Sequence, residues 1–235
     1  TKRTDLSYKV NYLEKGTNNV LHAQKVQNGM TFGTTVAASD EAIEIDGYTY
    51  NSADKDTLTI TTGENVINLY YTKRTDLSYK VNYLEKGTDN VLRTQKVQGN
   101  VTFGTTVVAS DEAIEIDGYK YDSADKATLP ITTGENVINL YYTRRTDLYA
   151  IVNYYWNGTG EKAAPSKELH DRTLGEAWTE SPIKIQGYTI ATTSSKTVTI
   201  QATGNVINFY YYKNVELTAK SKTVTYNGNV QTVEG

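Results

Sequence analysis

Residues 1–10 read TKRTDLSYKV, and the same ten residues return unchanged at 72–81. At this offset of 71 residues, positions 1–71 and 72–142 are identical at 60 of 71 places. An internal repeat of this kind is the first feature to settle, because it decides the architecture. The chain is therefore divided by its repeats before any strand is assigned.

A third and more divergent copy begins at residue 143 with TRRTDLYAIVNYY. It closes with GNVINFYY at residues 204–211, which matches GENVINLYY at 63–71 and at 134–142. The sequence thus predicts three modules, at residues 1–71, 72–142 and 143–213.

Both ends of the chain differ from the repeat. Residues 214–235 do not restart it, but KTVTY at 222–226 alternates like a strand, and Asn227-Gly228 is a turn signal. We expect the truncated start of a further β module, or a tail. At the other end, neither a signal peptide nor an initiating Met precedes TKRTDLS, so we expect an internal piece of a longer protein with another module upstream.

Within one module, the pattern is that of short β-strands. Tyr8, Val10 and Tyr12 alternate with polar residues, as in a half-buried strand. At 66–71 the apolar residues again fall on one face. A weak helical signal lies near 39–43, where Ser39 could act as the cap. The sequence predicts about five strands and at most one short helix in each module.

Composition excludes several classes of function. The chain has no Cys, so it has no disulfide and no thiolate metal site. It has no apolar run of 18 residues, and its net charge of −3 comes without a Lys/Arg stripe, which argues against membrane insertion and nucleic-acid binding. Catalytic motifs are missing, and Arg93 replaces His22 in the second module. We expect a monomeric non-enzyme without cofactor or metal.

An acidic run has two interpretations. Asp40, Glu41, Glu44 and Asp46 recur at 111–117, but their spacing does not match a calcium loop. A solvated acidic edge is the favoured interpretation, and a cation site is the alternative.

The aromatic residues are the best candidates for ligand binding. The chain has 20 Tyr, 3 Phe and 2 Trp, and exposed aromatic patches mark interaction sites. The other interpretation is that these rings close small cores as half-buried strand residues. The candidate ligand-binding residues are Tyr70, Tyr141, Tyr155, Trp156 and Trp178.

Together these features resemble the MucBP (mucin-binding protein) repeats of Gram-positive bacterial surface proteins. An opening strand such as YKVNY at 79–83 leads to an I-x-G-Y step at 45–48, 116–119 and 185–188. The third module shows the pattern most plainly, with VNYYWNGTGEKAAPSKEL at 152–169. The resemblance covers about 210 of the 235 residues. It departs from the family where Asp46, Asp117 and Gln186 stand in place of the Pro that members often carry before the Gly-Tyr step.

The resemblance implies a β-rich α+β fold of three tandem β-grasp (ubiquitin-like) modules. In such a module the first and last strands lie together at the centre of a small mixed sheet. It also implies secretion and attachment to the bacterial cell wall through a region absent here. The linkers at 72–76 and 143–147 lack Gly and Pro, so we expect an elongated, semi-rigid arrangement.

Two functions remain open. The first is a cell-surface adhesin that binds host mucin or related glycans through multivalent weak contacts. The alternative is a structural stalk that projects a separate adhesive domain from the cell wall. The adhesin predicts an affinity that climbs with the number of modules, and the stalk predicts no binding at any number.

Overall fold

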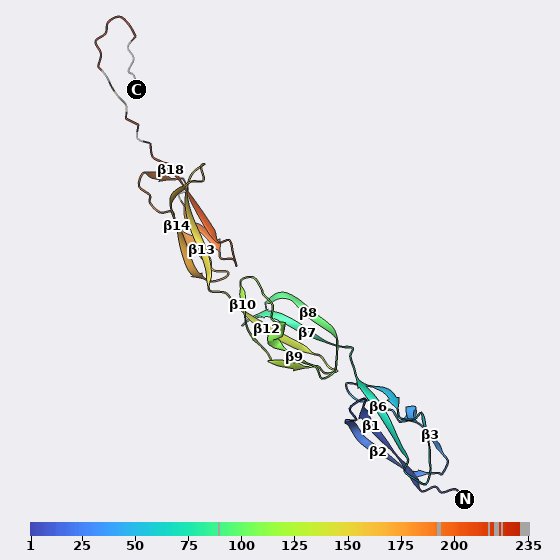
Figure 1. Ribbon diagram of the computed structural model, residues 1–235. Coiled ribbons are helices and arrows are strands. Elements are labelled where there is room, and N and C mark those ends of the chain that lie inside the picture. Colours follow the sequence, from blue (N-terminus) through green and yellow to red (C-terminus); the bar gives the residue numbers. More distant parts are fainter. Residues whose placement is uncertain (89, 192–193, 216, 219–220, 222, 231–235) are drawn as a thin grey trace. The chain divides into compact units, whose positions relative to one another are not determined.

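The fold is almost entirely β-sheet (Figure 1). A computed structural model describes residues 1–88, 90–191, 194–215, 217–218, 221 and 223–230. The chain divides into two compact units, residues 1–116 with 120–143, and residues 117–119 with 144–235. Each unit is described by itself.

In the first repeat, four strands form one mixed sheet in the order β2-β1-β6-β4. The two central strands, β1 and β6, run parallel, and the outer two pair antiparallel to them. This confirms the expected meeting of the first and last strands at the centre of a small sheet. A second, two-stranded sheet joins β3 to β5. The bounds are β1 Leu6–Glu14, β2 Val20–Met30, β3 Thr35–Ala37, β4 Tyr48–Ala53, β5 Thr57–Thr59 and β6 Val66–Lys73.

The second repeat has the same topology, with a sheet ordered β10-β12-β7-β8 and a pair β11-β9. Its strands are β7 Leu77–Glu85, β8 Val91–Val101, β9 Thr106–Val108, β10 Tyr119–Ala124, β11 Thr128–Pro130 and β12 Val137–Arg144.

The third repeat lies in the second unit and repeats the pattern as β14-β13-β18-β16 with β15-β17. Its strands are β13 Leu148–Trp156, β14 Lys162–Arg172, β15 Ala177–Glu180, β16 Tyr188–Ile190, β17 Lys196–Thr199 and β18 Val206–Lys213.

Alternation along β1 and β6 builds the core of each repeat. Tyr8, Val10 and Tyr12 are buried as predicted, and so are Leu69 and Tyr71 from β6. Each such side chain contributes roughly 1.5–3 kcal/mol by leaving water. No Cys is present to stabilise repeats of this size, so these large rings carry much of the burial.

The fully buried Tyr71 shows why the core uses tyrosine. Its hydroxyl donates to the carbonyl of Ile43 (3.1 Å) and accepts from the amide of Ile43 (3.0 Å). Tyr142 makes the same two bonds to Ile114, and Tyr211 donates to the carbonyl of Ile183. The hydroxyl thus makes hydrogen bonds to partly buried backbone groups that a phenylalanine could not make.

A buried asparagine fixes the turn before each closing strand. Asn65 is 4% exposed, and its side-chain amide donates to the carbonyls of Ser7 and Thr61, both at 3.0 Å. Its side-chain oxygen accepts from the amide of Thr61 at 2.9 Å. Asn136 and Asn205 do the same in the other repeats.

The expected short helical turn is present, and the expected acidic edge is exposed at Asp40, Glu44 and Asp46 but not at Glu41. The helical turn is a 3-10 helix, η1 (Ala38–Glu41), repeated as η2 (Ala109–Glu112), and no side chain caps it. Glu41 is buried rather than solvated, because the Tyr8 hydroxyl donates to it at 2.7 Å and the Lys25 ammonium bonds its other oxygen. Burial, and then the bond to Glu41, raises the pKa of Tyr8. The same carboxylate raises the pKa of Lys25.

The tail also differs from its prediction. Residues 223–226 carry no strand, and Lys222 lies outside the described residues. The turn signal is present, since the amide of Asn229 donates to the side chain of Asn227 and Gly228 has a φ of 87°.

Candidate ligand-binding surface

The outward face of the two central strands presents a pair of asparagines in every repeat, and the third repeat adds a pair of tyrosines. In the third repeat, β13 contributes Asn153 and Tyr155, and β18 contributes Asn208 and Tyr210. Successive strand residues point to opposite faces, so the buried alternation of the core leaves these four on the other side. In the parallel register Asn153 stands beside Asn208, and Tyr155 stands beside Tyr210. We call these four residues the outer-face platform.

The two tyrosines form the aromatic half of the platform. Their ring centroids lie 6.1 Å apart with planes inclined by 31°, and both rings are half-buried. The ammonium of Lys196 lies 5.8 Å from the Tyr210 ring and donates to the carbonyl of Asn208 at 2.6 Å. A cation over a ring is an attractive contact that keeps the ring oriented.

The two asparagines form the polar half. The amide of Asn153 donates to the side-chain oxygen of Asn208 at 3.0 Å, and the Ser166 hydroxyl donates to Asn153 at 2.7 Å. A side-chain amide has two donors and an oxygen with two lone pairs. The pair therefore keeps hydrogen-bonding capacity for a hydroxyl-rich ligand on the outward face.

The amide pair recurs in the first unit, but the tyrosine pair does not. Asn11 donates to Asn68 at 2.8 Å, and Asn82 donates to Asn139 at 2.8 Å. Beside Tyr70 and Tyr141, the opening strands carry Leu13 and Leu84 where the third repeat has Tyr155. These two tyrosines are half-buried and each has an aliphatic neighbour, so the aromatic pair belongs to the third repeat.

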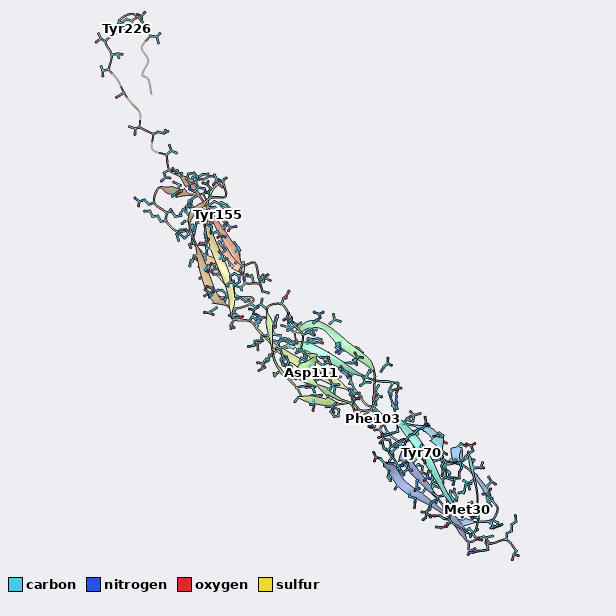
Figure 2. The ribbon with its side chains drawn as sticks, viewed as in Figure 1. Met30, Tyr70, Phe103, Asp111, Tyr155 and Tyr226 are labelled. Carbon is cyan, nitrogen blue, oxygen red and sulfur yellow. The ribbon has the colours of Figure 1, made fainter. Side chains whose placement is uncertain are left out.

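The structure separates the candidate residues of the third repeat. Tyr155 and Trp156 are adjacent in sequence and lie on opposite faces of β13. The Trp156 ring instead contacts Tyr188, with centroids 5.7 Å apart, and the Lys213 ammonium lies 5.5 Å from it. Figure 2 labels Tyr155 in the second unit and Tyr70 in the first.

Trp178 has a core position. It is 4% exposed on β15, and its indole nitrogen donates to Glu180 at 3.2 Å. A ring buried to this extent offers no face to a ligand, so Trp178 is left out of the platform. Sequence reasoning missed Tyr210, although the period of two along 206–213 placed it outward.

Two other kinds of site are absent from the residues that the structure describes. No cluster of His, Asp or Glu there is arranged to hold a metal ion. Within the same residues, no helix has the length and apolar character needed to cross a membrane.

Comparison with known proteins gives both a family and relatives. The MucBP domain family matches residues 9–72 and 150–234, which is 149 of the 235 residues. Internalin J of Listeria monocytogenes serotype 4b (strain F2365) is 29% identical over 223 residues, covering 92% of this chain and 23% of the relative. Internalin J of serovar 1/2a (strain ATCC BAA-679 / EGD-e) is 28% identical over 211 residues, covering 82% and 24%. The chain thus spans about a quarter of the length of these relatives.

Two solved structures are also similar. "Streptococcal High Identity Repeats in Tandem (SHIRT) domains 3-4 from cell surface protein" is 14% identical with a TM-score of 0.22, covering 59% of this chain and 98% of that one. Mub-RV is 16% identical with a TM-score of 0.24, covering 89% and 100%. At TM-scores this low, the likeness carries no further conclusion.

Proposed function

The chain belongs to the MucBP domain family, and from this premise we propose that it is a non-enzymatic repeat segment of a bacterial cell-surface adhesin. Its ligand is host mucin or a related glycan, bound weakly at each repeat. The protein lies outside the cell and is attached to the wall through another part of the longer protein. Its folding units are the repeats at 1–71, 72–142 and 143–213, each of the β-grasp class.

The observation that carries this proposal is the outer-face platform. Sugars present hydroxyl groups and apolar C–H faces, and the platform sets a tyrosine pair beside an amide pair. Amide groups can donate to and accept from hydroxyls, while the half-buried rings supply apolar surface. The strands that hold these side chains are the two central ones, so the platform rests on the most constrained part of the sheet.

Repetition raises the overall affinity of contacts that are weak one by one. Linked sites raise the effective concentration of one another, and avidity can exceed a single affinity by about 10²–10⁴. The amide pair in all three repeats gives three potential contacts. The third repeat is expected to bind best, because it alone has the tyrosine pair.

The same difference favours a second candidate function for the first unit. Leu13 and Leu84 remove the ring that would complete the platform. The first two repeats would then act as a structural stalk with little binding of their own.

Binding to immobilised mucin, before and after enzymatic deglycosylation, tests the adhesin proposal. We expect the chain to bind intact mucin and to lose binding with the sugars. The double variant Tyr155→Ala/Tyr210→Ala should lower the affinity at least tenfold. Tyr149→Ala is the matched control, because Tyr149 is a 56% exposed tyrosine six residues earlier on the same strand.

The outcomes separate the two functions. Loss of binding in the double variant, with binding kept in Tyr149→Ala, supports the platform as the binding site. Equal loss in Tyr149→Ala would contradict it. No binding of the unaltered chain at high concentration would leave the stalk as the function of the whole segment.

A further inference from the structure

Within the first unit, Phe103 of the second repeat lies against the Gly-Tyr step of the first (Figure 2 labels Phe103). Its ring centroid is 5.7 Å from that of Tyr48, with an interplanar angle of 62°. A Cβ placed on Gly47 would lie 2.4 Å from each of three consecutive ring atoms of Phe103, Cγ, Cδ2 and Cε2.

The three equal distances show where the Cβ position of Gly47 lies relative to the Phe103 ring. Points equidistant from three atoms of a regular hexagon lie on the axis through its centre. The hydrogen of Gly47 that a Cβ would replace therefore lies over the face of the Phe103 ring, close to the axis through its centre. Any side chain at position 47 would occupy the space of the ring, so the contact needs glycine, and the φ of +77° there also favours it.

The linker between the two repeats holds the ring in place. The amide of Phe103 donates to the carbonyl of Arg74, and the amide of Arg74 donates to the carbonyl of Gly47, both at 2.9 Å. A side-chain bond from Thr133 to Asp46 lies beside it. The ring, the linker and the glycine thus form one connected contact. We call the inserted side chain, here Phe103, the plug, and the glycine that it covers, here Gly47, the socket.

The second unit shows the same arrangement with an aliphatic plug. A Cβ on Gly118 would lie 2.6 Å from Cδ1 of Leu174. The amide of Leu174 donates to the carbonyl of Arg145 at 3.0 Å, and the amide of Arg145 donates to the carbonyl of Gly118 at 2.8 Å. Among the described residues, no atom lies within 4 Å of the corresponding position on Gly187, so that socket is open.

The first repeat carries a plug of its own. TFGTT stands at 31–35 as it does at 102–106, and the amide of Phe32 donates to the carbonyl of Arg3 at 2.8 Å. The Phe32 ring is 42% exposed, whereas Phe103 is half-buried. The backbone amide of Phe32 is therefore bonded to its linker in the same way as that of Phe103, whereas the Phe32 side chain is open to solvent.

We propose that the exposed face of Phe32 is a docking surface for the Gly-Tyr step of another repeat of this type, joined ahead of residue 1. The partner follows from continuity with the seated contact: the linker residues 1–7 are identical to 72–78, and the plug sequence is the same. A glycine Cα–H that lies over the face of a ring distinguishes this partner from a general apolar surface. One repeat thus docks onto another of the same type, because each carries a plug at one end and a socket at the other.

The test extends the full chain with a second copy of residues 1–71 placed directly before residue 1. This reproduces the natural junction between residues 71 and 72. The readout is the NMR shift of the glycine Hα in each I-x-G-Y step, since a proton above a ring centre moves upfield. In the unextended chain, Gly47 should be shifted upfield of Gly187, and Phe103→Ala should abolish that shift.

In the extended chain, the glycine of the added copy should show the same upfield shift as Gly47. Phe32→Ala should abolish the shift of the added glycine and leave Gly47 unchanged. Phe32→Leu is the second variant, because Leu174 already serves as a plug in the third repeat. It should keep the fold and still remove the ring-induced shift.

Three results would overturn the proposal. The added glycine could resonate where Gly187 does with Phe32 intact. Its shift could survive both Phe32 variants. In the unextended chain, a shift of Gly187 that grows with concentration would place Phe32 on a second copy of the chain instead of on a joined repeat.

Discussion

Asn68 is bonded on two sides: it accepts from the Asn11 amide at 2.8 Å and donates to Asp54 at 3.1 Å. Its backbone amide also donates to Asp54, at 3.0 Å. Gln24 extends the chain of bonds by donating to Asn11 at 2.7 Å. Four side chains from separate segments are thereby linked across the outward face of the first sheet.

Replacing Asn68 by a carboxylate should therefore destabilise the first repeat. Asn68→Asp removes the donor to Asp54 and sets two carboxylates against each other, for a loss of about 1–3 kcal/mol. Amide hydrogen exchange, resolved by repeat, should show faster exchange along β1 and β6. Asn208→Asp is the matched control, since its side-chain oxygen accepts from Asn153 and Lys196 lies close by. Equal effects of the two variants would contradict this account.

The buried Asn65 predicts a larger loss. Asn65→Ala leaves the amide of Thr61 and the carbonyl of Ser7 without partners, which should lower the unfolding free energy of the first repeat by about 3 kcal/mol. Urea unfolding followed by exchange at the turn measures the change. Asn28→Ala, at an exposed position where the second repeat has Gly99, should change stability by less than about 0.5 kcal/mol.

Stability should also fall in alkali. Burial raises the pKa of Tyr8 and Tyr71, and the bond to Glu41 raises that of Lys25. For each group the folded state holds its proton more tightly than the unfolded chain. The contribution is therefore complete below the ordinary values of 10.0 and 10.5, and it is lost as pH rises through the raised folded values.

The measurement is the unfolding free energy from neutral pH to strong alkali, with tyrosinate absorbance recorded in parallel. Tyr8→Phe should remove part of the alkaline loss and lower stability at neutral pH by breaking the bond to Glu41. A flat profile above pH 10, or an unchanged slope in the variant, would show that these protons do not stabilise the fold.

Gly47→Ala and Gly187→Ala separate backbone strain from ring contact. Both glycines have positive φ, +77° and +82°, so alanine costs each about 1–2 kcal/mol. Only at Gly47 does the new methyl group meet the Phe103 ring. Calorimetry should show a clearly larger loss for Gly47→Ala, and proton NMR should show a displaced Phe103 ring. Similar losses would mean that the ring moves away without consequence.

Much of the fold follows from alternation in the sequence. The alternation at Tyr8, Val10 and Tyr12 predicts the buried face of β1. The 71-residue repeat predicts the same buried face in β7. These features depend only on how apolar and polar residues alternate along one strand, and this alternation is visible in the sequence.

What escaped prediction depends on contacts between distant residues. Glu41 looked like part of a solvated acidic run, but Tyr8 and Lys25 reach it from other strands. Tyr210 became a platform residue only through the parallel register with Tyr155, and Trp178 entered the core through the small second sheet of its repeat. A residue's type and spacing do not reveal such partners.

The parallel pairing of β1 and β6 has a mechanical consequence. Six residue pairs, from Lys9 beside Val66 to Glu14 beside Tyr71, join the strand that enters a repeat to the strand that leaves it. Because the two strands run in the same direction, a pull on the two ends of the repeat slides one strand along the other. The evenly spaced bonds of a parallel ladder then share the load and must yield together, rather than opening one after another.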